Sequence, residues 1–187
     1  MSASGSSVPS EEERFSCNAR ALTQRMVEEI DILQAQGYCA NLPTHLLKML
    51  PTLIAMYNKK ELLEGFIRNS YRYWGEIYNR DIVFFRDNAD EIFAAKLPTV
   101  NVRLFREIFA EKDSRGGLIL KPETIEYIWN NFQAMVKISL KYIHRERRPS
   151  TYQDQAGNEC IRYANPDFFA EIAVPRLATI WKVTLAI

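Results

Sequence analysis

Histidine and cysteine, which most often bind transition metals or act as nucleophiles in proteins, are scarce in this chain. The histidines are His45 and His144, and the cysteines are Cys17, Cys39 and Cys160. Neither histidine has a cysteine or a second histidine at the spacing of a zinc site. An odd number of cysteines cannot close into a complete disulfide framework. The cysteine content is therefore more typical of a protein in a reducing compartment than of a disulfide-bonded one. We therefore predict no metal or other cofactor and an intracellular location, cytoplasmic or nuclear.

The chain also lacks an excess of either charge, a long hydrophobic run and a targeting segment. Its 24 Lys and Arg residues balance 23 Asp and Glu residues, so no global field attracts nucleic acid or an anionic membrane. The longest apolar runs are far shorter than the roughly 20 residues of a membrane-spanning helix. Residues 1–10 are small and polar, without the basic and apolar regions of a signal peptide. We expect this segment to be a disordered tail.

Bulky hydrophobic residues are abundant, whereas glycine is rare. Hydrophobic residues make up 47% of the chain, and 10 Phe, 9 Tyr and 3 Trp stand beside only 7 Gly. This composition is typical of a folded globular protein and favours helices with bulky buried faces. At this length one domain is expected, and we place it at residues 11–187.

Two helices are predicted by both their periodicity and their first turns. Apolar residues recur at three- and four-residue steps over 11–36 and over 122–144. The first segment follows Ser10, which has capping-box spacing to Glu13. The second opens with Pro122, a residue favoured in the first turn of a helix.

The segment 59–95 has the strongest helical pattern, since it contains no proline and keeps helical spacing throughout. Gly75 and the polar stretch 79–81 are its expected points of bending or breakage. Shorter helical patterns surround this segment, and 149–165 is expected to be a loop. The predicted fold is therefore all-α, an irregular bundle of about six to seven helices, two of them long. Whether the apolar end at 180–187 packs internally or on another chain stays open.

The loop 111–118 is similar to a calcium-binding EF-hand loop, with Gly116 at the turn position. However, Arg115 stands where an oxygen ligand is needed, and Pro122 stands where the bidentate glutamate belongs. We interpret this loop as an ordinary turn between helices. The sequence also holds no Gly-rich phosphate loop, no GxSxG and no HExxH motif, which favours a protein that is not an enzyme.

A stripe of cations is the most distinctive local feature of the sequence. Lys137, Lys141, Arg145 and Arg148 follow one another at steps of four and three, so they are expected on one helix face, joined by His144. Such a stripe can hold phosphate groups or an acidic partner. The favoured interpretation is a solvated face whose charges complement the C-terminal end of the helix dipole.

A second cluster combines cations with aromatic rings, which stack on nucleobases or anchor protein interfaces. Its members are Arg68, Tyr71, Arg72, Tyr73, Trp74 and Arg80. Because side chains this close in sequence cannot all leave a helix in one direction, several are expected in the core or at its rim. Arg72, Tyr73 and Trp74 are the candidate interaction residues of this cluster.

Two resemblances follow from these aromatic helices. The stretches SYRYWGEI (70–77) and VKISLKYIH (136–144) resemble short helical proteins of large nucleocytoplasmic DNA viruses, and the resemblance covers residues 60–149. Because that family has no settled activity, it implies only a viral interaction or virion-associated protein. The stretch YWGE (73–76) is similar to the Asn-Trp-Gly-Arg groove motif of the B-cell lymphoma family of apoptosis regulators. Glu76 replaces the arginine of that motif, which inverts the charge.

The leading hypothesis is thus a non-enzymatic helical interaction or structural protein that contacts another protein or a second copy of itself. The alternative is a nucleic-acid or phosphate-binding protein that uses the stripe at 137–148. A groove protein like the apoptosis regulators is a third possibility. An enzyme would require a pocket that holds titratable groups with perturbed pKa values.

Overall fold

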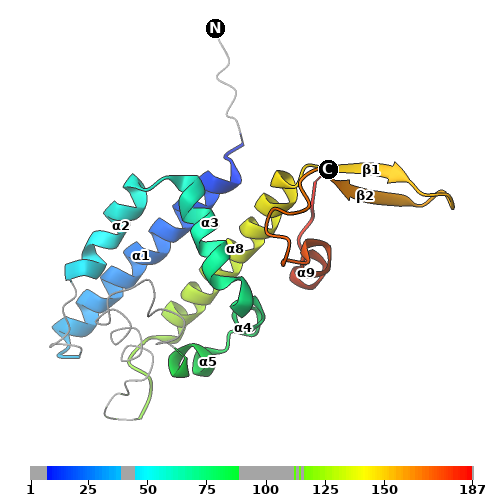
Figure 1. Cartoon of the computed structure of the whole chain (residues 1–187). Coiled ribbons are helices and arrows are strands. Elements are labelled where there is room, and N and C mark those ends of the chain that lie inside the picture. The colour runs from blue at the N-terminus through cyan, green and yellow to red at the C-terminus, as the bar shows by residue number, and fades with distance from the viewer. Residues whose placement is uncertain (1–7, 39–44, 89–111, 113, 115, 187) are drawn as a thin grey trace, which may run out of the picture.

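The computed structural model describes residues 8–38, 45–88, 112, 114 and 116–186, and this part of the chain is mostly helical with one small two-stranded sheet (Figure 1). No helix within it is long and apolar enough to cross a membrane. The helices are α1 (Glu11–Ala35), α2 (His45–Met56), α3 (Lys59–Ser70), α4 (Trp74–Asn79), α5 (Ile82–Asp87), α8 (Pro122–Glu146) and α9 (Val174–Trp181), with a 3-10 turn, η1 (Tyr71–Tyr73), before α4. The strands are β1 (Pro149–Gln153) and β2 (Glu159–Tyr163).

The two helices with clear first-turn signals lie where they were predicted. In α1 the Ser10 hydroxyl accepts a hydrogen bond from the backbone N–H of Glu13 at 3.2 Å. The Glu13 carboxylate in turn accepts from the backbone N–H of Ser10 at 3.1 Å. Pro122 occupies the first turn of α8, and that helix continues to Glu146, just beyond the predicted end. A capping box therefore marks the start of α1, and a first-turn proline marks the start of α8.

Helix α8 forms the centre of the core, because α1, α3, α4 and α9 all pack against it. Val136, Leu140 and Ile143 on this helix are fully buried. In α1 and α3, Phe15 and Ile67 contribute to the same cluster. Truncation of a buried side chain of this size costs roughly 2–5 kcal/mol of stability. Substitutions on the buried face of α8 should therefore be strongly destabilising.

The helical segment predicted at 59–95 is divided within its described part, because the chain breaks at η1 and again at Arg80. Gly75 lies inside α4 and causes no break. Arg80 adopts a left-handed conformation, with φ of 56°, and its guanidinium binds Glu126 and Asn130 of α8. The polar stretch was correctly identified as a break, while the residues of this segment beyond Asn88 lie outside the described part.

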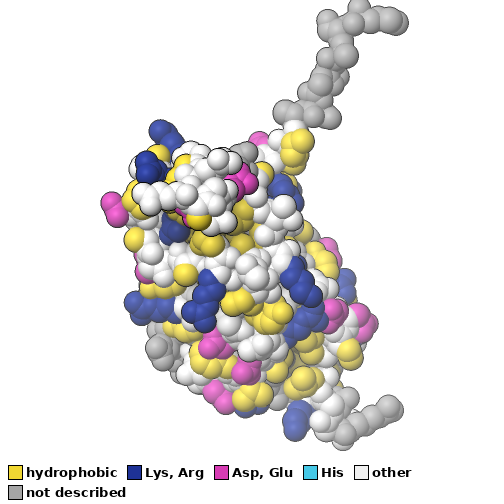
Figure 2. Space-filling model, turned by 90° about the vertical axis from the view of Figure 1, so that its right-hand side faces the viewer, with side chains coloured by type: hydrophobic (Ala, Val, Ile, Leu, Met, Phe, Trp, Pro, Cys, Tyr) yellow, Lys and Arg dark blue, Asp and Glu magenta, His cyan; other side chains and the backbone are white. Residues whose placement is uncertain are grey.

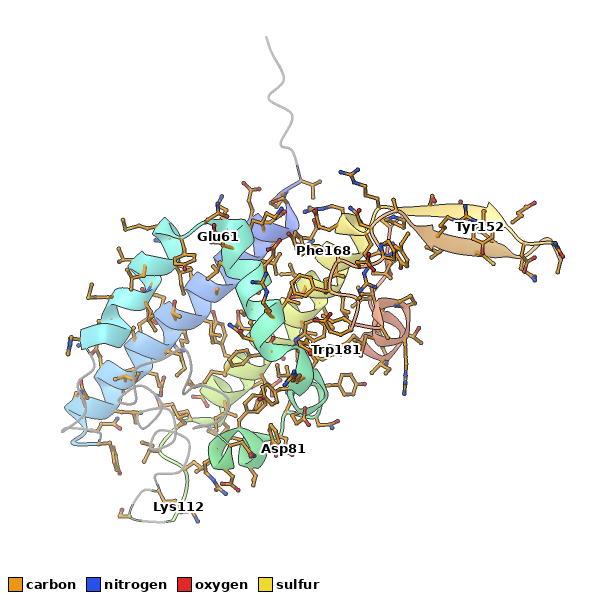
Figure 3. All side chains as sticks on the ribbon, in the orientation of Figure 1. Glu61, Asp81, Lys112, Tyr152, Phe168 and Trp181 are labelled. Atoms are coloured by element: carbon orange, nitrogen blue, oxygen red, sulfur yellow. The ribbon has the colours of Figure 1, made fainter. Side chains whose placement is uncertain are left out.

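The predicted loop at 149–165 is wrong as well, because most of it forms an antiparallel hairpin. Its register runs from the pair Pro149 and Tyr163 to the pair Gln153 and Glu159, and the hairpin projects from the helical body. Figure 3 shows Tyr152 on the projecting part. An alternating pattern is missing from the sequence because most hairpin residues are exposed on both faces. The fold is therefore mostly helical but not all-α.

The C-terminal segment folds back onto α8 around Arg147, whose side chain is buried. Its guanidinium donates hydrogen bonds to the carbonyl oxygens of Phe168 and Ile172, at 3.0 and 3.1 Å, and to that of Phe169. Burial lowers the pKa of this arginine. Further on, Trp181 is buried against Tyr78 of α4, with ring centroids 5.2 Å apart (Figure 3). Much of the apolar C-terminal end therefore packs within this chain.

We expect Arg147→Met to lower the free energy of unfolding by about 2–4 kcal/mol, because buried carbonyl groups lose their charged donor. Urea denaturation followed by circular dichroism measures this loss. Arg148→Met is the matched control, since the neighbouring Arg148 is exposed and the same change there should cost less than about 0.5 kcal/mol. Equal losses in the two variants would show that the carbonyl contacts do not hold this segment.

Candidate functional site

The predicted cationic stripe divides into residues with different surroundings. Lys137 and Lys141 lie one turn apart on α8, the first exposed and the second partly buried. Arg145 follows on the same helix, one further turn along. Arg148 lies beyond the end of α8 with φ of 50°, so its predicted place on the helix face is wrong.

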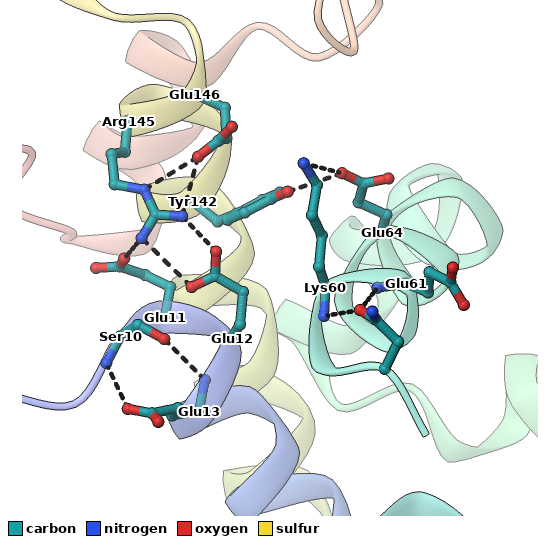
Figure 4. Close-up of polar contacts among 11 residues, drawn as sticks. Ser10, Glu11, Glu12, Glu13, Lys60, Glu61, Glu64, Tyr142, Arg145 and Glu146 are labelled. Carbon is teal, nitrogen blue, oxygen red and sulfur yellow. Dashed lines mark hydrogen bonds and ion pairs between the residues drawn. The ribbon is translucent and has the colours of Figure 1, made fainter. Parts of the chain in front are cut away.

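Arg145 is partly exposed, but its charge is paired with carboxylates (Figure 4). Its guanidinium forms ion pairs with Glu11 and Glu12 of α1 and with Glu146 of its own helix. The hydrogen bond with Glu12 is the main reason why the pKa of Arg145 is raised. The guanidinium also lies 5.2 Å from the centre of the Tyr142 ring. Arg145 therefore fastens the start of α1 to the end of α8.

The hydroxyl of Tyr142 extends the same network to α3. It donates a hydrogen bond of 2.7 Å to Glu64, which also pairs with Lys60 (Figure 4). Glu64 forms a further ion pair with Arg68. Burial and the neighbouring carboxylate raise the pKa of this tyrosine, so the hydroxyl stays protonated. The contact serves packing between helices.

His144 lies in the core, with 2% of its surface exposed. Its Nδ1 atom lies 3.0 Å from the hydroxyl of Tyr163 in β2. Burial lowers the pKa of His144, so the imidazole is mostly neutral near pH 7. It therefore adds no positive charge to the protein surface.

The aromatic cluster is also divided between core and surface. Trp74 is 1% exposed, and its indole N–H donates to the hydroxyl of Ser70 at 3.0 Å. Tyr73 is partly buried, and its ring lies 5.9 Å from that of Phe84. Arg72 alone of the three candidates is exposed. This cluster is therefore mainly part of the core and its rim.

Lys137 and Lys141 line a groove of about 540 Å³, formed where the first turns of α1 and the residues after α9 meet α8. Viewed from the side on which the hairpin projects, the surface shows Lys and Arg side chains set among hydrophobic ones (Figure 2). The lining residues are Pro9, Glu13, Arg14, Cys17, Asn18, Ala134, Lys137, Ile138, Lys141, Lys182, Val183 and Thr184.

The floor and the charges of the groove come from different residues. Ala134, Ile138 and Val183 supply apolar surface, and Ile138 is itself buried in the core. The cations are Arg14, Lys137, Lys141 and Lys182. We call them the groove cations.

None of the groove cations forms an ion pair or a side-chain hydrogen bond with another residue in the described part of the chain. The carboxylate in the lining, Glu13, already binds Lys59 at 3.4 Å and the backbone N–H of Ser10. The groove therefore keeps an excess of unpaired positive charge over an apolar floor.

Sequence reasoning found Lys137 and Lys141 but missed Arg14 and Lys182. The two missed cations lie far from α8 in the sequence, within an acidic helix start and after a short helix. No local pattern marks them. Only the packing of both chain ends against α8 brings them to the groove.

Acidification should lower the stability of the wild-type protein more steeply than that of an Arg145→Met variant. Partial burial alone raises the pKa of Glu12, but the hydrogen bond from Arg145, with others, lowers it below the ordinary value. A carboxyl with a lowered pKa in the folded state stabilises the fold above its unfolded pKa and loses this contribution as the pH falls through the folded pKa. The urea midpoints of the wild type and of Arg145→Met should therefore approach each other as the pH falls from about 6 to about 3. Parallel curves for the two proteins would contradict this role of the pair.

No protein-family model matches the chain, and no curated protein or solved structure matches it. The viral and apoptosis-regulator resemblances therefore stay predictions.

Proposed function

We propose that the protein is a non-enzymatic binding protein that takes an anionic ligand in the groove between α1, α8 and the residues after α9. The observation that supports this proposal is the gathering of unpaired cations around an apolar floor. A volume of about 540 Å³ falls within the range of ligand sites, roughly 300–1,000 Å³. Such sites combine apolar walls with a few polar groups that orient the ligand.

The energetics favour a ligand with more than one negative group. An exposed ion pair contributes only about 0.2–1 kcal/mol, because both charges lose solvent and side-chain freedom when they meet. Several such pairs, formed together above an apolar floor that also loses solvent, give a useful affinity. The groove cations are spread over α1, α8 and the C-terminal segment, which suits such a ligand.

The lining also supports binding rather than catalysis. It includes one thiol, that of Cys17, but no histidine to act as its base. Glu13 is held by Lys59 and by its capping box, so its carboxylate is not available as a general base. We therefore assign the groove cations the role of holding charge on a ligand.

Charge reversal of Lys137 and Lys141 to glutamate should weaken the binding of inorganic tripolyphosphate about tenfold or more, as measured by isothermal titration calorimetry. The matched control reverses Arg148 and Arg176, which are exposed cations outside the groove lining. This control has the same net charge as the groove variant and should bind like the wild type. Binding by the wild type should also weaken with added salt.

The proposal is wrong if tripolyphosphate binds the groove variant and the control equally well. It is also wrong if the wild type binds no anionic ligand at low salt. Thermal unfolding of each variant establishes that the charge changes leave the protein folded.

A further inference from the structure

The chemistry of the groove narrows the class of ligand, if the proposed function holds. The groove cations come from three separate segments of the chain. Lys137 and Lys141, one turn apart, are separated by roughly 6 Å along α8. Arg14 comes from α1, and Lys182 comes from the segment after α9. Cations that line a groove from several segments suit a ligand whose negative groups are spaced along a chain.

A nucleic acid does not fit this lining. Proteins that bind single strands stack bases on aromatic rings, at about 1–3 kcal/mol per base, and no aromatic residue is part of the groove lining. The start of α1, which forms one side of the groove, carries three successive glutamates, Glu11, Glu12 and Glu13. A long polyanion that extends past this side would meet carboxylates. A short anionic segment avoids them.

The floor adds an apolar requirement. Ala134, Ile138 and Val183 present hydrocarbon between the cations, and burial of this surface is favourable only for a ligand with an apolar group of its own. Free phosphate compounds and purely acidic chains lack such a group. An acidic peptide with a large aliphatic side chain between its carboxylates provides both.

We infer that the occupant of the groove is a short segment of a partner protein in which acidic residues flank a large aliphatic residue. The aliphatic side chain covers the floor made by Ala134, Ile138 and Val183. The flanking carboxylates pair with the groove cations. Specificity follows from the combination, because a ligand that lacks either group leaves part of the groove unpaired or exposed to water.

Fluorescence anisotropy with labelled peptides tests this inference on the full chain. The probe has the core Asp-Glu-Leu-Asp-Glu, and the two comparison peptides replace either its leucine by serine or its acids by their amides. We expect the probe to bind about tenfold tighter than the serine peptide, since an anchored leucine contributes at least about 1.4 kcal/mol. The amide peptide should bind more weakly still, and Val183→Ser in the protein should reduce the preference for leucine.

Two further ligands separate this inference from the proposed function. One contrary outcome is that tripolyphosphate or oligodeoxythymidylate binds at least as tightly as the leucine peptide and that this binding requires Lys137 and Lys141. In that case the groove binds anions but the peptide inference is wrong. Equal affinities for the leucine and serine peptides also overturn the inference. If none of these ligands binds, both the inference and the proposed function fail. Thermal unfolding of Val183→Ser shows whether that variant keeps its fold.

Discussion

Two arginines at the C-terminal end of α8, Arg145 and Arg147, each bind another segment of the chain to this helix. The chemistry of the two contacts differs. Arg145 pairs with carboxylates of α1 at a partly exposed site. Arg147 is buried and binds backbone carbonyl groups of the segment before α9. The start of α1 and the residues that follow α9 are two of the three parts of the groove. Each of these two arginines therefore holds a segment that leads into one wall of the groove beside Lys137 and Lys141.

The run from His144 to Arg148 shows why basic residues in sequence do not amount to a basic surface. Successive positions on a helix point about 100° apart, so adjacent cations face different surroundings. His144 points into the core, Arg145 meets carboxylates and Arg147 meets carbonyl groups. Arg148 has already left the helix. The step of four residues correctly placed Lys137 and Lys141 on one helix face. The same spacing did not predict the surroundings of Arg145 and Arg148, because α1 pairs with Arg145 and α8 ends before Arg148.

The predictable parts of the fold are those determined by neighbouring residues. The capping box at Ser10 and the first-turn position of Pro122 marked α1 and α8 correctly. By contrast, the break at Arg80 is supported by contacts with α8, and the hairpin has no buried face that would leave an alternating pattern. The same distinction applies to the groove. Lys137 and Lys141 were accessible to sequence reasoning, whereas Arg14 reaches the groove only through tertiary packing.

The distribution of carboxylates explains why the groove cations stay unpaired. The chain has nearly equal numbers of acidic and basic residues, so each groove cation could in principle have had an acidic partner. Around Arg145 three carboxylates, from Glu11, Glu12 and Glu146, gather on one guanidinium. The nearby Glu13 is directed to Lys59 and its own helix cap. Leaving like charges together beside an apolar floor weakens the unliganded fold, since they repel one another and gain no pairing. Such a local loss of stability is typical of binding sites. The unliganded protein lacks the opposite charges and the apolar cover that the bound partner supplies.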